Sequence, residues 1–236
     1  MRGGIFLFIL FMLVSTPAIA ADDTGLSADR VSSPKQISWD FYESRVHRSG
    51  KAGFHCRNAP IAGHMVNGLP VLRAALDLRD NGAILTGCTL TSSADAEFEV
   101  TNPNGALIEF GCRLQGEFDK TSLHGIAWAE GVFSLNSAWM KYGPWRCTKN
   151  AEQPRGDQPE NMQISFSKNN TTVGCIPQGS YKATAQMISR AGFRGGKNTP
   201  GEVSIDLAST SDYGFTVILV FLGECQYQSE PPKTLD

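Results

Sequence analysis

The sequence predicts an all-β protein, an antiparallel sandwich or small barrel held together by disulfides. Three observations predict it. Two turns built from Asn and Gly, at residues 80–82 and 102–105, separate segments in which apolar and polar residues alternate. Short alternating segments with glycines at their ends continue beyond residue 114. Six cysteines follow an N-terminal segment that resembles a secretory leader in its pattern.

Residues 1–20 have the order of a signal peptide. Arg2 precedes a ten-residue apolar run at 5–14, and small residues stand at Ala18 and Ala20. This run is shorter than the ~20 residues needed to cross a bilayer, so we expect cleavage after Ala20 and no transmembrane span. The mature chain is then soluble and either secreted or periplasmic. Residues 21–36 are short, polar and rich in Asp and Ser, which predicts a disordered arm.

The charge balance excludes partners that are bound by charge alone. The chain has 21 Lys and Arg against 23 Asp and Glu, and loss of the leader removes Arg2, which leaves 20 against 23 and a net charge of −3. Such a chain recruits neither nucleic acid nor anionic lipid by charge.

The first strand is predicted at residues 37–42, where Ile37, Trp39 and Phe41 share one face. Residues 47–53 then predict a loop, and residues 58–70 mostly turn. The turn at 80–82 predicts a hairpin with a three-residue loop, because that register gathers the apolar residues on one face. A helix over 69–79 is the alternative. The expected hairpin pairs are Leu78 with Ile84, Leu76 with Thr86, Ala74 with Cys88 and Leu72 with Leu90.

The second turn, Asn-Pro-Asn-Gly at 102–105, has the residues of a type I turn followed by a bulge. Its hairpin register is expected to place Glu99 opposite Glu109 on a face open to water. On the inner face it pairs Val100 with Ile108, Phe98 with Phe110 and Ala96 with Cys112.

Alternation continues to residue 135, and a polar stretch with two prolines then suggests a boundary. We predict a first β (sub)domain at 37–150, a linker at 151–161 and a second β (sub)domain at 162–236. Strands are expected at 162–166, 181–187, 203–207 and 213–227, the last being buried on both faces. One two-sheet body that shares a single core is the other arrangement.

An even number of cysteines in an exported chain predicts three disulfides, and no C-x-x-C pair suggests zinc or redox chemistry. Register and position favour Cys88 with Cys112, Cys56 with Cys147 and Cys175 with Cys225.

The usual catalytic motifs, from the Walker loop to G-x-S-x-G and H-E-x-x-H, do not occur, and no cofactor or metal site is predicted. The best ligand-binding candidate combines flat aromatic rings with a cation: Trp139, Tyr142, Trp145 and Arg146. Burial of the tryptophans over the core is the alternative interpretation of that segment. A basic loop at 190–201 could meet an anion or simply connect two strands.

These observations favour an exported, non-catalytic binding or interaction protein whose partner is a protein or a carbohydrate. One alternative is a secreted hydrolase whose site is assembled from residues distant in sequence, such as His124 with Glu109 or Glu130. Another is a periplasmic inhibitor that inserts a loop into an enzyme cleft.

Overall fold

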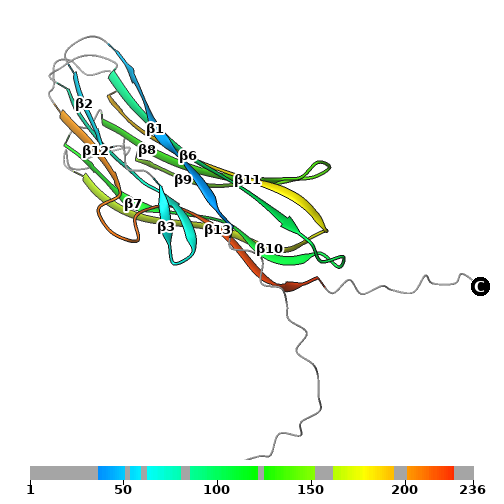
Figure 1. Cartoon of the computed structure of the whole chain (residues 1–236). Helices are drawn as coiled ribbons and strands as arrows, with labels where there is room; N and C mark the ends of the chain where they lie inside the picture. The colour runs from blue at the N-terminus through cyan, green and yellow to red at the C-terminus, as the bar shows by residue number, and fades with distance from the viewer. Residues whose placement is uncertain are drawn as a thin grey trace, which may run out of the picture. The chain divides into compact units, whose positions relative to one another are not determined.

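Two antiparallel sheets lie face to face, as the two layers of strands in Figure 1 show. The computed structural model describes residues 37–50, 54–59, 63–80, 86–121, 125–151, 162–193 and 201–225. Every regular element within these ranges is a β-strand, which confirms the all-β prediction, and the two layers fit its sandwich form. The segment weighed as a helix, 69–79, is strand on both sides of Arg73.

Sheet A has five strands in the order β1-β6-β11-β8-β9. The long strand β11 lies at its centre and pairs with β6 on one side and β8 on the other. The bounds are β1 (Trp39–Ser49), β6 (Thr86–Val100), β8 (Gly125–Asn136), β9 (Lys141–Ala151) and β11 (Gly179–Phe193).

Sheet B is built on β7 (Ala106–Lys120), whose whole length pairs with β10 (Met162–Ile176) along one edge. Its other edge pairs with β12 near one end and with β13 over the rest. The sheet continues from β12 to β5 and β2, and from β13 to β4 and β3. The remaining bounds are β2 (Phe54–Ala59), β3 (His64–Val66), β4 (Leu69–Leu72), β5 (Ala74–Asp80), β12 (Gly201–Leu207) and β13 (Gly214–Glu224).

The core lies between the sheets, because alternate residues of each strand point inward. Phe133 of sheet A and Phe118 and Phe215 of sheet B are among the largest fully buried side chains. The packing is close: a Cβ at Gly131 of β8 would lie 1.9 Å from the Phe215 ring. Glycine at 131 therefore leaves room for a ring from the opposite sheet.

The two predicted hairpins are wrong in their pairing. β5 and β6 belong to opposite sheets, and so do β6 and β7, so both connections carry the chain from one sheet to the other. The turn chemistry of 102–105 is present nevertheless: the Gly105 N–H donates to the Asn102 carbonyl at 2.9 Å, and Gly105 has φ of 79°. Glu99 lies opposite Ser180 in sheet A, whereas Glu109 lies in sheet B. Residues 81–85 of the first turn lie outside the described residues.

A true hairpin occurs in the segment 58–70, which was expected to be mostly turn. β3 and β4 pair through Asn67 and Gly68, which both have positive φ, 50° and 79°. Asn-Gly is the typical signal for such a two-residue loop. Strand β1 also extends to Ser49, into the segment 47–53 that was expected to be a loop.

Strands from both predicted (sub)domains alternate within the same two sheets. β11 lies between β6 and β8, while β12 and β13 pair with β7. The strands before and after the predicted linker at 151–161 therefore do not form separate sheets. This pairing fits the other predicted arrangement, in which both halves share one core. β9 ends at Ala151 and β10 begins at Met162, while residues 152–161 lie outside the described residues.

Strand β13 is buried on one face rather than on both. Phe215 and Val217 are fully buried, while Ile218 and Val220 on the other face are partly exposed and Leu222 is exposed. Because the fold has only two layers, one face of β13 meets the other sheet and the opposite face does not.

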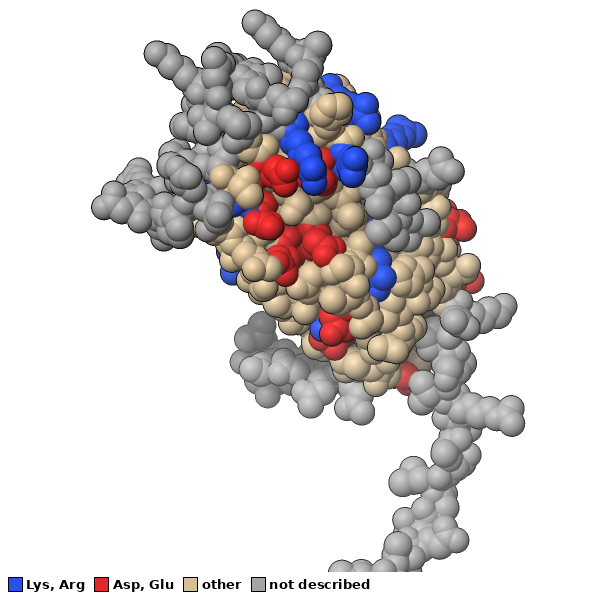
Figure 2. Space-filling model, turned by 90° about the vertical axis from the view of Figure 1, so that its left-hand side faces the viewer, with Lys and Arg blue, Asp and Glu red and all other residues tan. Residues whose placement is uncertain are grey.

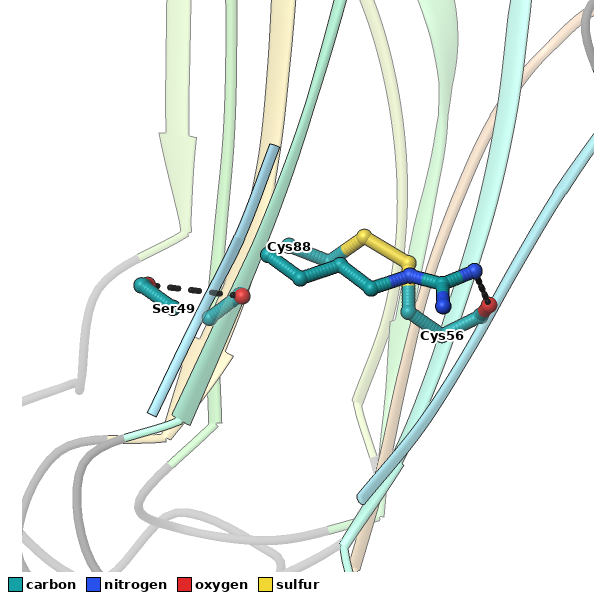
Figure 3. The surroundings of a disulfide bond; sticks show 5 residues. Ser49, Cys56 and Cys88 are labelled. Atoms are coloured by element: carbon teal, nitrogen blue, oxygen red, sulfur yellow. Dashed lines mark hydrogen bonds between the residues drawn. A yellow bond between two sulfur atoms is a disulfide. The ribbon is translucent and has the colours of Figure 1, made fainter. Parts of the chain in front are cut away.

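The structure contains two disulfides. Cys175–Cys225 is confirmed, but Cys88–Cys112 and Cys56–Cys147 are wrong, because Cys88 bonds Cys56. Figure 3 shows the Cys56–Cys88 bridge. It joins β2 of sheet B to β6 of sheet A, and an Arg48 nitrogen donates to the Cys56 carbonyl at 3.3 Å. The error follows from the wrong hairpins, since β2 and β6 become neighbours only across the sandwich.

The predicted signal peptide at 1–20 and the arm at 21–36 lie outside the described residues. No helix in the described part of the chain has the length and apolar character to cross a membrane.

Candidate functional site

Trp139 lies at the tip of the connection between β8 and β9. Ser137 closes this turn, because its N–H donates to the Met140 carbonyl at 2.8 Å and its hydroxyl accepts from the Met140 N–H at 3.0 Å. The Trp139 side chain is 93% exposed, so its ring is held out from the body of the protein on a tight turn.

Tyr142 and Trp145 point toward the core instead. Trp145 is 8% exposed and packs against Phe110 and Phe133, with ring centroids 4.6 and 5.3 Å apart. Tyr142 is partly buried near Phe110 and Tyr181. The positions of these two rings agree with the alternative interpretation of this segment, in which its aromatic residues are buried over the core.

Arg146 faces the opposite way, because neighbouring residues of a strand alternate between faces. Its guanidinium bonds the Glu130 carboxylate at 2.8 Å on the outer face of sheet A. The structure therefore does not bring Trp139, Tyr142, Trp145 and Arg146 onto one surface. Trp139 and Arg146 remain accessible, at separate places around sheet A.

The outer face of sheet A carries three hollows in succession along β11, and we call them together the β11 track. The first has a volume of about 530 Å³, the middle about 500 Å³ and the third about 340 Å³. Outward-facing residues of β11 line each of them: Ser180 and Lys182, then Thr184, Gln186 and Ile188, then Arg190 and Gly192. From 180 to 192 the strand covers about 40 Å.

The first hollow lies beside the Trp139 turn. Glu97 and Glu99 of β6 and Asn136 of β8 contribute carboxylate and amide groups to it, and Ser137 and Ala138 form its rim. Trp139 follows Ala138 directly, so an exposed ring stands next to a hollow lined by hydrogen-bonding groups.

The middle hollow is lined by groups that are already held in place. The hydroxyls of Ser134 and Thr184 hydrogen-bond each other at 2.8 Å across neighbouring strands. Arg146 and Glu130 form their ion pair at one side. Between this hollow and the first, Lys182 bonds the Asp95 carboxylate of β6 at 3.3 Å. These cross-strand contacts already order the side chains, so less conformational entropy would be lost when a ligand binds.

Two glycines create space in the third hollow. Gly87 of β6 and Gly192 of β11 are directly opposite in the register, so no side chains fill this part of the sheet surface. His47 and Ser49 of β1 line the hollow as well. Beside it, the Arg190 guanidinium lies 5.5 Å from the centre of the Trp128 ring, in a cation–π contact on the same face.

The β11 track is rich in groups that hydrogen-bond and contains no reactive constellation among the described residues. Within these ranges, no three His, Cys, Asp or Glu side chains are arranged to hold a metal ion. Of the residues suggested for a hydrolase, Glu130 is on sheet A and Glu109 on sheet B, while His124 lies outside the described residues.

Charges of both signs are mixed on the molecule. Figure 2 shows one face on which Asp and Glu side chains gather in groups with Lys and Arg side chains close by. On sheet B, for example, Arg79 lies 3.5 Å from Asp77 and 3.3 Å from Glu202. The β11 track has the same mixture, because Lys182 and Arg146 each pair with a carboxylate.

Part of the track carries a signal in the sequence. The strict alternation at 181–187 predicted a strand with one apolar face, and its other face consists of the polar residues that line the hollows. Their neighbours Asp95, Glu130 and Arg146 come from three other strands. Only the sheet order brings these residues beside β11.

No family model matches the chain, and no curated protein matches it. Among solved structures it is similar to TmCBM61 in complex with beta-1,4-galactotriose, with 12% identity and a TM-score of 0.23 over 75% of this chain and 88% of that one. It is also similar to the enzymatically active domain of bacteriophage CBA120 tailspike protein 4, with 12% identity and a TM-score of 0.23. That match covers 76% of this chain but only 19% of the tailspike chain. A third similar structure is the family 11 carbohydrate-binding module of Clostridium thermocellum cellulase Lic26A-Cel5E, with 10% identity and a TM-score of 0.17. That match covers 77% of this chain and 88% of the module. At these TM-scores the likenesses say nothing about the ligand of this chain.

Proposed function

We propose that the protein binds a neutral polysaccharide along the β11 track on the outer face of sheet A. One observation carries the proposal: three hollows follow one another along a single strand, so a ligand that fills them is a long, extended chain. At about 40 Å, the track is several times longer than one sugar ring.

The side chains of the track suit a ligand that is rich in hydroxyl groups. Carboxylates and amides such as Glu97, Asn136 and Gln186 accept from and donate to hydroxyls, and those of Ser134 and Thr184 do both. Aromatic rings at Trp139 and Trp128 offer flat apolar surfaces that match the C–H face of a sugar.

This surface offers a peptide strand fewer hydrogen bonds than a sheet edge does. A peptide that joins a sheet bonds to the free backbone groups of an edge strand. β11 is a central strand whose backbone already pairs with β6 and β8, so a ligand lying over it meets side chains only. Hydrogen bonds must then come from the ligand's own polar groups, which a polysaccharide has along its whole length.

The mixed charges favour a neutral polymer over a densely charged one. Lys182 and Arg146 stand beside Asp95 and Glu130, so a chain with a single repeated charge would meet a like charge in the first and middle hollows. A neutral chain can bond to both kinds of group.

Affinity electrophoresis of the mature chain in gels that contain soluble β-glucan, galactan, xylan or mannan tests the proposal. At least one of these polymers should retard the native chain. Gln186→Trp places a bulky ring in the middle hollow and should abolish the retardation. Gln115→Trp is the matched control, because Gln115 also points outward from a long central strand but lies on sheet B.

The proposal is contradicted if none of these polymers retards the native chain, or if Gln186→Trp binds as well as Gln115→Trp. Circular dichroism of both variants shows that each is folded before the comparison is made.

A further inference from the structure

Cys112 and Cys147 are buried thiols that face each other across the sandwich. Cys112 lies on β7 of sheet B and is 0% exposed, and Cys147 lies on β9 of sheet A and is 2% exposed. Both side chains point inward, because each cysteine is buried while Arg113, Arg146 and Thr148 beside them in the strands are exposed.

The two side chains are already in contact. The Cys147 Sγ donates to the Cys112 carbonyl oxygen at 3.1 Å. A disulfide requires that the Cα atoms of its cysteines be near each other and that the side chains point together. The Cys147 sulfur touches the main chain of Cys112, so the two side chains lie together between facing strands.

We propose that Cys112 and Cys147 form a third disulfide in the mature protein, covalently joining β7 of sheet B to β9 of sheet A. All six cysteines are then paired, which agrees with the even number in the chain although the partners differ from those expected from sequence. The bridge lies away from Cys56–Cys88, which joins β2 to β6. The two sheets are thereby tied at separate places.

The bond forms by thiol–disulfide exchange with an external disulfide, such as oxidised glutathione or the disulfide of an oxidoreductase. As a thiolate, Cys147 is the first nucleophile in this scheme. It attacks one sulfur of the external disulfide and releases one thiolate. Cys112 then loses its proton and attacks the Cys147 sulfur, releasing the second. Two protein thiols are oxidised by two electrons, and the external disulfide is reduced to two thiols.

The position of the bridge affects the candidate site. β9 is the last strand in the order of sheet A and pairs with β8. It carries Arg146, which lines the middle hollow, next to Cys147. A covalent bond at Cys147 holds this strand, and with it the Arg146 side of the hollow, against the core.

Peptide mapping without reduction tests the proposal. The chain is refolded in reduced and oxidised glutathione, denatured without reductant, alkylated with iodoacetamide and digested. We expect a crosslinked peptide that joins Cys112 to Cys147 and no alkylation of either. The Cys56–Cys88 and Cys175–Cys225 crosslinks in the same digest show that enough oxidant was present.

Alkylated Cys112 and Cys147 beside both other crosslinks would overturn the proposal, and so would a crosslink of either cysteine to a different partner. Cys112→Ala is the matched control, because it leaves Cys147 without a partner and should make that cysteine the site of alkylation. The bridge would close a loop between cysteines 35 residues apart in sequence, which restricts the unfolded chain. We therefore expect the bridged chain to melt about 10 °C higher than the double variant with alanine at both positions.

Discussion

Replacing Gly131 with alanine tests the packing distance between the two sheets. A Cβ at this position would lie 1.9 Å from Cδ2 and 2.1 Å from Cε2 of Phe215, which comes from the opposite sheet. Phe215 is 0% exposed, so its ring has no solvent to move into. Overpacking of a close-packed core costs about 1–3 kcal/mol, and we expect the upper end of that range because the clash is with a rigid ring. The free energy of unfolding should therefore fall by about 3 kcal/mol.

Urea denaturation with the disulfides intact measures this change. Gly174→Ala is the control, since the nearest atom to its new Cβ would be Cζ of Phe110, at 3.2 Å, and we expect a change within about 0.5 kcal/mol. Adding Phe215→Leu to Gly131→Ala should relieve the clash, so that the double variant is at least about 1 kcal/mol more stable than the sum of the single effects predicts. Equal stability of Gly131→Ala and Gly174→Ala, or simple additivity, would refute the packing argument.

Two further predictions concern stability. Trp145→Ala should lower the free energy of unfolding by about 3–5 kcal/mol, because it empties a core site between Phe110 and Phe133. Trp139→Ala should change it by less than about 0.5 kcal/mol, and equal effects of the two in urea would contradict the placement of these rings. Lys120 is 2% exposed and its Nζ has no hydrogen-bond partner among the residues that the structure describes, so burial lowers the pKa of this amine. Lys120→Met should therefore be more stable by about 1–3 kcal/mol at neutral pH. This advantage should shrink as the pH rises through the folded-state pKa toward the ordinary lysine value, because the native amine then becomes neutral; a constant difference from pH 7 to 10 would disprove the assignment.

The sequence predicts the strands well because their signal is local. Alternation with a period of two identifies which residues face inward, and Ala96, Val100, Ile108 and Cys112 are all buried as expected. The turn at 102–105 also has the predicted chemistry, with Gly105 at positive φ. Both features depend only on neighbours along the chain.

The partner of each strand depends on contacts that are distant in sequence. Apolar faces on both sides of a turn can meet as neighbours in one sheet or as facing layers of two sheets, and the residues of the turn allow either. The chain here crosses between sheets after both predicted turns. Cys56–Cys88 was missed for the same reason, whereas Cys175–Cys225 was found because it rested on no hairpin register.

The candidate site was predicted only in part. An aromatic segment near residue 140 was visible in the sequence, but the alternation within β9 divides it between the core and the surface, with Trp145 inside and Arg146 outside. The hollows of the β11 track combine residues of several strands, such as Asp95 with Lys182 and Glu130 with Arg146. No spacing in the sequence indicates those neighbours before the sheet order is known.

Mapping amide chemical shifts by NMR, during titration with the polysaccharide that retards the chain, tests most directly whether sheet A is the binding face. The account predicts that the largest shifts follow the β11 track, at Ser93, Glu130, Thr184 and Gln186, while Gln115 on sheet B stays unchanged. Shifts concentrated on the outer face of sheet B, with β11 unaffected, would contradict it.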